Sequence, residues 1–348
     1  MRKIIILTDY KGYFGSKWHS LPYRSGYDQT KLAGYFQEYG YSVEFIRLSE
    51  VEFVKDDWNG QIVLYTSSEE PGYHYKSYIE DVILGLERLG AILIPSFDLL
   101  KANNNKVYME VLRQSRINIP ELHMKSITIG TFEELEQKII DGIIPFPCVL
   151  KKAEGSMSRG VYLAKNEKEL KRYSKKISRT KHLKSEFQDQ LRQQKHKGYA
   201  GESKFQGKFI IQPFISGLTN DWKVLIYWDH YYILKRHVRK NDFRASGSGI
   251  NYKAGSEAGF PTQQFKYLKQ VFNNLDTPNL SIDFAYDGKL GYILEFQGVF
   301  FGTSTQYKSK DYFLQTANEW RIEHKELDQE GEFVYSIVKY MESKGLNK

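Results

Sequence analysis

The segment SIDFAYDGKLGYILEFQ, residues 281–297, contributes most to the fold assignment. Its two apolar halves read as strands, and Asp287-Gly288 between them is a strong signal for a hairpin turn. Glu295 and Gln297 lie two residues apart on one strand, so their side chains project from the same face. Pairing across the hairpin brings Asp283 alongside them. Three oxygen donors on one face are what Mg²⁺ prefers. An exposed polar strand would explain any one of these residues, but not all three between apolar neighbours.

A glycine-containing polar turn occurs earlier in the chain. Lys151 ends an apolar strand and leads into Glu154-Gly155-Ser156-Met157-Ser158-Arg159-Gly160, after which a strand resumes. Backbone N–H groups in such a turn can bind phosphate, and its glycines allow close approach. The turn is not a Walker loop, because the GK[ST] ending is missing, and it is not a dinucleotide fingerprint, because a strand follows it. Taken alone, such a turn is more often an ordinary hairpin turn.

Basic residues at three further places point to an anionic ligand. Lys106 follows three asparagines, which are candidate N-caps for a helix running to about Ser115. Arg236 lies on an expected strand, and Arg244 lies in a loop of small residues that continues to Ser246. Surface charge on a sheet explains basic strand residues comfortably. It explains an arginine among small residues, where nothing bulky blocks a ligand, less well.

The first hundred residues alternate between short apolar strands and helices. Apolar runs at 3–7 and 61–65 read as buried strands, and the segment 75–89 has helical spacing. Such alternation predicts an open parallel sheet with helices on both faces. Further along, Thr131 and Glu134 form a capping box that predicts the start of another helix.

The composition is that of a globular protein. Of the 348 residues, 41% are hydrophobic and 15% aromatic, which excludes a disordered chain. The single cysteine, Cys148, excludes an intramolecular disulfide framework and a four-cysteine zinc site, and the apolar run around it indicates a buried thiol. The apolar stretches are too short to span a membrane, so we expect a cytoplasmic protein.

Positive charge is concentrated in one segment, residues 165–208, which has 14 Lys and Arg against 5 Asp and Glu. Because the whole chain carries +8, the remainder is nearly neutral. A nucleic-acid-binding protein more often spreads its charge over a face, and this segment has few aromatic side chains for stacking, so nucleic acid is not the expected partner. The segment reads either as a solvated pair of charged helices or as a mobile flap that meets an anionic molecule.

Together and in this order, these motifs resemble the ATP-grasp family, most closely its RimK type. The resemblance extends from about Lys101 to Gly302 and implies an ATP-grasp fold of mixed α/β and α+β class. It implies three domains: a parallel α/β domain over residues 1–100, a central α+β domain over 101–208 with the basic insertion 165–208, and a C-terminal α+β domain over 209–348 with the metal site. ATP would lie between the last two.

The resemblance also assigns roles to individual residues. The nucleotide would be bound by Lys106, Lys151, Glu154, Gly155, Ser156, Gly160, Gln212, Pro213, Phe214, Asp221 and Ser246. Mg²⁺ would be bound by Asp283, Glu295 and Gln297, and Arg236 or Arg244 would stabilise the oxyanion of a tetrahedral intermediate. The sequence departs from the family in four places: Gln297 stands where Asn is usual, Gly298–Gly302 replaces a Ser-Pro-Gly motif, Ser158 replaces a common glycine, and the basic insertion is longer than in a compact member.

The resemblance implies an ATP-dependent ligase that joins a carboxylate to an amine through an acyl phosphate. We expect an acidic acceptor, either a peptide or a sugar, because of the basic insertion. Two alternatives stay open: a phosphotransferase on the same scaffold, and a nucleotide-binding module without turnover. The sequence leaves the identity of both substrates and a homo-oligomeric state undecided.

Overall fold

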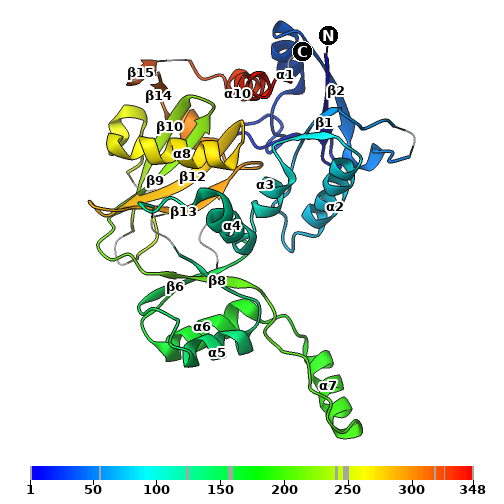
Figure 1. Cartoon of the computed structure of the whole chain (residues 1–348), viewed down its shortest axis with the longest axis vertical. Coiled ribbons are helices and arrows are strands. Elements are labelled where there is room, and N and C mark those ends of the chain that lie inside the picture. The colour runs from blue at the N-terminus through cyan, green and yellow to red at the C-terminus, as the bar shows by residue number, and fades with distance from the viewer. Residues whose placement is uncertain are drawn as a thin grey trace. The chain divides into compact units, whose positions relative to one another are not determined.

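The computed structural model describes residues 2–54, 56–122, 125–155, 160–239, 242–245, 251–316, 319–324 and 326–346. The chain forms two compact units (Figure 1). Unit 1 contains residues 1–103, 112–122 and 218–348, and unit 2 contains residues 104–111 and 123–217. The division into three domains stays a prediction.

The N-terminal part of unit 1 is built on a parallel sheet, as the alternating sequence predicts. Its strands are β1 (Arg2–Thr8), β2 (Tyr41–Arg47), β3 (Ile62–Tyr65) and β4 (Ile92–Ile94), in the spatial order β2-β1-β3-β4. Helix α1 (Gln29–Glu38) connects β1 to β2, and α2 (His74–Arg88) connects β3 to β4. The short helix α3 (Phe97–Ala102) follows β4.

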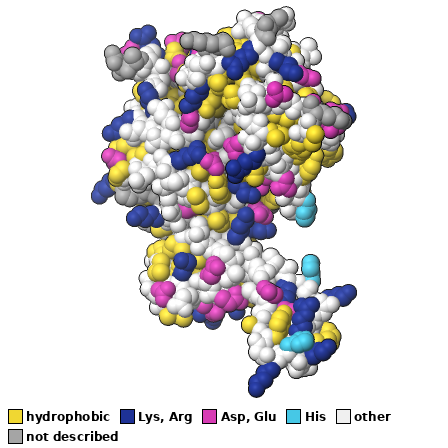
Figure 2. Space-filling view, turned by 45° about the vertical axis from the view of Figure 1, so that its right-hand side comes forward, with side chains coloured by type: hydrophobic (Ala, Val, Ile, Leu, Met, Phe, Trp, Pro, Cys, Tyr) yellow, Lys and Arg dark blue, Asp and Glu magenta, His cyan; other side chains and the backbone are white. Residues whose placement is uncertain are grey.

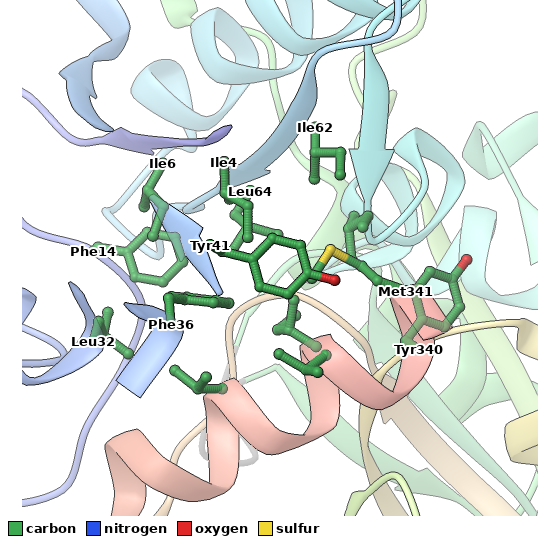
Figure 3. Packing of buried hydrophobic residues seen from close by; sticks show 14 of the residues in the cluster. Ile4, Ile6, Phe14, Leu32, Phe36, Tyr41, Ile62, Leu64, Tyr340 and Met341 are labelled. Atoms are coloured by element: carbon green, nitrogen blue, oxygen red, sulfur yellow. The ribbon is translucent and has the colours of Figure 1, made fainter. Parts of the chain in front are cut away.

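Apolar side chains cover both faces of this sheet. On one face, Leu32 and Phe36 of α1 pack with Ile4 and Ile6 of β1 and with Met341 of α10 (Gln329–Ser343), as Figure 3 shows. The other face packs against α2 and Leu100 of α3. The last helix of the chain therefore completes the core that the first strand begins.

The rest of unit 1 is an antiparallel sheet with the order β13-β12-β9-β10-β14-β15, and β11 pairs with β10. The strands are β9 (Asn220–Tyr227), β10 (His230–His237), β11 (Lys253–Ala254), β12 (Asn279–Tyr286), β13 (Gly291–Gln297), β14 (Asp311–Gln315) and β15 (Trp320–His324). Two helices accompany them, α8 (Phe265–Leu275) and α9 (Ser304–Lys308).

The two faces of this sheet differ in character. One face packs against α8, where Phe265 contacts Tyr231, Phe313 and Trp320. The opposite face is apolar in its middle, where Leu225, Tyr227, Tyr232 and Tyr312 pack with Phe301. Beyond this apolar cluster, the same face carries the charged side chains of the candidate site.

Unit 2 contains an antiparallel sheet of order β5-β8-β6-β7. Its strands are β5 (Ile127–Ile129), β6 (Cys148–Lys152), β7 (Val161–Ala164) and β8 (Phe209–Pro213), and its helices are α5 (Phe132–Ile140), α6 (Glu167–Ser178) and α7 (Leu183–Lys195). Thr131 and Glu134 form the expected capping box of α5. Cys148 is fully buried, as the sequence predicts.

The basic segment 165–208 has two parts. Leu170 of α6 belongs to the core of unit 2, and α6 packs against β6, β7 and α5. Helix α7 has three exposed apolar side chains, Leu183, Phe187 and Leu191, and Figure 2 shows Lys and Arg side chains gathered around it. If part of this segment acts as a flap, that part is α7, because α6 is held by its core contacts.

The structure differs from the sequence-based expectations in several places. Helix α4 (Lys106–Leu112) ends earlier than expected and continues as a π-helical turn at Arg113–Ile117. The many glycines and alanines of residues 243–259 predict a loop, but the described part of this stretch contains β11 and a 3₁₀ turn at Gly255–Ala258. The sequence analysis did not assign α3, α8, α9, β5, β14 or β15. No helix within the described ranges has the length and apolar character that a membrane span requires.

Candidate active site

The polar face of the antiparallel sheet in unit 1 gathers residues from four strands. Asp283 of β12 lies directly opposite Glu295 of β13, and Gln297 lies opposite Ser281. Directly paired residues of antiparallel strands project from the same face. The hairpin therefore places Asp283, Glu295 and Gln297 on one face, in the arrangement that the sequence predicts.

An irregularity in this hairpin lies beside the carboxylates. Phe284 pairs with Ile293 while Asp283 pairs with Glu295, so Leu294 is an extra residue on β13. Such a β-bulge twists the strand and re-aims the neighbouring side chains. The bulge thus sets the direction of Glu295 relative to Asp283.

Arg236 is the central cation of this face. From β10, it donates from Nε to Asp221 Oδ1 at 2.6 Å and from Nη2 to Asp221 Oδ2 at 2.8 Å. Its Nη2 atom also lies 2.9 Å from Asp283 Oδ2. Arg236 is 5% exposed and Asp221 is 6% exposed, so the bidentate pair is almost fully desolvated.

Burial and charge act in opposite directions on this pair. Burial raises the pKa of Asp221, and the guanidinium of Arg236 opposes that rise. Burial lowers the pKa of Arg236, but the charges of Asp283 and Asp221 outweigh it and leave that pKa above its ordinary value. The guanidinium therefore stays charged and holds two carboxylates in fixed positions. Its predicted role at an oxyanion stays a prediction, as does the nucleotide contact of Asp221.

Lys223 is a residue of this face to which the sequence analysis gave no role, although the stretch Asp221-Trp222-Lys223 stood out on one expected strand. It lies two residues after Asp221 on β9, so both side chains project from the same face, and it lies directly opposite Asp283 on β12. Its ammonium group adds a second cation to the face that carries the carboxylates.

The donor set fits a hard divalent cation. Asp283 and Glu295 supply two carboxylates and Gln297 supplies a carbonyl oxygen, and Mg²⁺ is commonly held by one or two carboxylates together with substrate phosphates. The side chain of Asp283 is 20% exposed, so one edge of its carboxylate remains open to a ligand. The described ranges contain no group of three His, Cys, Asp or Glu side chains arranged for a metal.

In unit 2, Lys106 anchors the glycine turn. Its backbone N–H donates to Ala153 O at 2.9 Å, and its Nζ donates to Gly155 O at 3.2 Å. Asn105 caps the helix that Lys106 begins, because its side chain accepts from the N–H of Tyr108. Two candidate phosphate-binding elements, the start of α4 and the glycine turn, are thereby joined.

The described ends of the glycine turn require glycine. Gly155 has φ +132° and Gly160 has φ +74°, both in the left-handed half of backbone space. Gly160 also accepts from the N–H of Lys152, whose Cβ would lie 3.0 Å from a Cβ added at Gly160. Ser156 lies outside the described residues.

The remaining predicted nucleotide residues of unit 2 lie on or beside its sheet. Lys151 is half-buried near the end of β6, and Glu154 lies 3.7 Å from Lys208 Nζ. Gln212 is buried on β8 and donates to Ser126 Oγ at 2.8 Å, so its side chain serves the packing of the sheet. Pro213 is exposed at the end of that strand, and the N–H of Phe214 donates to Pro147 O.

Arg244 is held by a neighbouring carboxylate. Its Nε and Nη2 donate to Asp242 Oδ2 at 3.0 and 2.8 Å, and this contact lowers the pKa of Asp242. The side chain of Arg244 is half-exposed and therefore accessible to an anion. Ser246 lies outside the described residues.

Comparisons with known proteins identify the same family as the motifs. Residues 89–197 match the RimK-like ATP-grasp domain. No curated protein matches the chain.

Solved structures share the fold over nearly the whole chain. The D-cycloserine synthetase DcsG superposes with a TM-score of 0.54 at 11% identity, covering 98% of this chain and 99% of that one. A RimK domain ATP-grasp protein from Sphaerobacter thermophilus has a TM-score of 0.52 at 10% identity, with 97% and 99% covered. A RiPP-associated ATP-grasp ligase from Chryseobacterium gregarium, solved with ADP and a leader and core peptide, has a TM-score of 0.54 at 12% identity, with 99% and 97% covered.

The family match and the shared fold agree with the fold and class expected from the motifs. The family match supports an ATP-binding enzyme of the ATP-grasp type. At these identities the solved structures establish the fold alone, and the residue roles remain predictions. Residues 89–197 therefore carry a RimK-like ATP-grasp domain, and the chain as a whole shares its fold with ATP-grasp proteins.

Proposed function

We propose that this protein activates a carboxylate substrate with ATP and joins it to an amine. In the first step, a carboxylate oxygen of the substrate attacks the γ-phosphorus of ATP, and ADP leaves. In the second, the amine nitrogen attacks the acyl carbon of the acyl phosphate, phosphate leaves, and the amine loses a proton. The products are an amide, ADP and phosphate.

The observation that carries the proposal is the linked set of charges on one sheet face. Asp283 lies opposite Glu295, and Arg236 joins Asp283 to Asp221 through three contacts of 2.9 Å or less. A buried arginine that is shared by two carboxylates fixes their positions before any ligand binds. Fixed carboxylates are what phosphoryl transfer requires, since its catalysis consists mainly of positioning and charge stabilisation.

Each group has a distinct task in this proposal. Asp283, Glu295 and Gln297 would hold Mg²⁺, which neutralises charge on the transferring phosphoryl group. Lys106, Lys151 and the N–H groups of the glycine turn bind phosphate oxygens. Arg244, half-exposed beside Asp242, provides the accessible cation for an oxyanion, whereas Arg236 is committed to Asp221 and Asp283.

We propose further that one substrate is anionic. The segment 165–208 has a net charge of +9, of which α6 and α7 carry +4 and the connecting residues carry +5. Opposite charges raise the rate of encounter, and salt screens this attraction with a Debye length of about 10 Å at 0.1 M ionic strength. The KM for the anionic substrate should therefore rise with added salt, while kcat changes little.

Hydroxylamine provides a direct test, because it traps acyl phosphates as hydroxamates whatever the natural amine is. Wild-type protein with ATP, Mg²⁺, hydroxylamine and a panel of carboxylates should form a hydroxamate and ADP in equal amounts. Asp283→Asn should lower this rate by about 100-fold or more, on the scale of other losses of a charge-stabilising group. Asp287→Asn, on the exposed turn of the same hairpin, is the matched control and should retain the rate.

Two other outcomes would contradict the proposal. A stable phosphorylated product formed without an amine would identify a phosphotransferase. Tight binding of ATP with no ADP formed from any carboxylate would identify a nucleotide-binding module.

A further inference from the structure

Three aromatic side chains lie together on the surface of unit 1. The ring of His19 lies between that of Trp18, at a centroid distance of 5.5 Å, and that of Tyr307, at 4.6 Å. Trp18 and Tyr307 are each 44% exposed, and His19 is also exposed. We name this group the aromatic platform. Large aromatic side chains are costly to leave in water, so a cluster of three exposed rings calls for an explanation.

Buried hydrogen bonds hold the platform loop in place. The N–H of Trp18 donates to Thr303 Oγ1 at 2.7 Å, and Thr303 Oγ1 donates to Gln329 Oε1 at 2.7 Å. One residue before Trp18, Lys17 forms an ion pair of 2.5 Å with Glu330, whose side chain is buried. The loop that carries two of the rings is therefore anchored to α10 on both its main chain and a side chain.

The backbone at the platform is also constrained. His19 has φ +59°, a left-handed conformation that costs energy in a non-glycine residue. Residues held in such conformations persist where surrounding contacts fix them, and they are frequent at ligand sites. Here the anchored loop holds His19 between the two other rings.

The platform lies on the sheet face that carries the carboxylates. Tyr307 belongs to α9, which follows β13 in the chain and packs against β9 and β10. Phe301, just before α9, packs on Tyr232 of β10, and Arg236 lies four residues further along the same strand. Four residues of strand span about 13 Å. A substrate that extends along β10 from Tyr232, where α9 packs, to Arg236 is therefore longer than one sugar or amino-acid unit.

The chemistry of the rings favours a sugar. Indole, imidazole and phenol rings combine an apolar face with a polar edge. The C–H-bearing face of a pyranose packs on such ring faces, and its hydroxyl groups reach the polar edges. The proposed ligase function requires a carboxylate on one substrate. A glycan that supplies both a sugar face for the rings and a carboxylate for activation is one that contains uronic acid.

We propose that the aromatic platform binds a sugar unit of an acidic glycan, and that the carboxylate activated by this enzyme is that of a uronic acid in the same glycan. This inference rests on the proposed ligase function. The uronate oxygen attacks the γ-phosphorus of ATP and ADP leaves; the amine then displaces phosphate from the acyl carbon and yields a glycan carrying an amide. No oxidant or reductant is needed.

Binding tests the platform independently of turnover. Tetrasaccharides of galacturonate, mannuronate and a glucuronate-containing repeat are titrated calorimetrically, beside neutral maltotetraose and tetraglutamate. At least one uronate tetrasaccharide should bind the wild type. Trp18→Ala and Tyr307→Ala should each weaken that binding by about 30-fold, the usual scale for a central aromatic contact. Tyr39→Ala is the matched control, because Tyr39 is 45% exposed in the same unit, and it should bind as the wild type does.

The outcomes separate the platform from the ligase function. Hydroxamate formation from the bound uronate, with a raised KM but unchanged kcat in Trp18→Ala and Tyr307→Ala, supports both. Binding that depends on the platform, without hydroxamate, supports the sugar site and contradicts the ligase. Hydroxamate from tetraglutamate together with no binding of any uronate tetrasaccharide overturns the sugar site and leaves the ligase standing. Equal binding by the wild type and both platform variants also overturns it.

Discussion

The pairing of Arg236 with Asp221 makes a quantitative prediction about stability. Arg236→Met keeps most of the side-chain volume but leaves the Asp221 carboxylate, 6% exposed, without its two contacts of 2.6 and 2.8 Å. Removing one partner of a buried ion pair costs roughly 3–5 kcal/mol, because an uncompensated charge remains buried. We expect Arg236→Met to lower the free energy of unfolding of unit 1 by about that amount, and Asp221→Leu to do so similarly.

The double variant Arg236→Met/Asp221→Leu distinguishes pairing from simple packing. Replacing both partners of a buried pair by apolar groups is often close to neutral, so the double variant should be more stable than the sum of the single losses predicts. Asp283, the other partner of Arg236, has a side chain that is 20% exposed, so water can solvate its carboxylate when Arg236 is removed.

Urea titration followed by tryptophan fluorescence measures this directly, because all five tryptophans of the chain lie in residues of unit 1. Single losses below about 1 kcal/mol would contradict the idea that the pair is desolvated, on the usual cost of burying an unpaired charge. Strict additivity of the two single losses would contradict the idea that they interact.

Three further predictions concern other parts of the chain. Gly160→Ala should weaken binding of a non-hydrolysable ATP analogue, measured by calorimetry, because the φ of +74° at Gly160 and the Lys152 Cβ at 3.0 Å oppose a side chain. Gly142→Ala is the control and should bind the analogue normally, because Gly142 has a similar φ of +67° but open space around it. Burial raises the pKa of Glu70, but hydrogen bonds from Ser68 and from the N–H groups of Lys76 and Tyr75 outweigh burial and hold that pKa below its ordinary value. The stabilisation from these bonds is therefore complete above the ordinary pKa of a glutamate and is lost as the pH falls through the lowered pKa. Glu70→Gln should flatten this acid limb in melting curves, and an unchanged limb would refute the assignment. Burial raises the pKa of the Cys148 thiol to about 12, so iodoacetamide at pH 8 should label unfolded but not native protein, as mass spectrometry would show.

Local signals in the sequence predicted much of the fold. The period-two pattern and the Asp-Gly turn of residues 281–297 gave the β12–β13 hairpin and the pairing of Asp283 with Glu295. The capping box at Thr131 and the alternation of the first hundred residues were equally reliable, because each depends on neighbours in the chain.

The features that sequence reasoning missed depend on contacts between distant segments. The ion pairs of Arg236 with Asp221 and Asp283 depend on the order of the strands in the sheet, and spacing along the chain does not reveal that order. Helix α9 has only five residues, too few to show a helical period, yet it supplies Tyr307 to the aromatic platform. Helix α8, by contrast, was predictable from the sequence, because its apolar residues 265, 268, 271, 272 and 275 follow helical spacing.

The most direct test of the central claim follows an oxygen atom through the reaction. A carboxylate substrate found by hydroxamate trapping is labelled with ¹⁸O in its carboxyl group, and the released phosphate is analysed by mass spectrometry. If the carboxylate attacks the γ-phosphorus to form an acyl phosphate, its attacking oxygen leaves with the phosphate, and each turnover places one ¹⁸O in that product. Phosphate that carries no ¹⁸O, formed alongside the amide, would contradict the account.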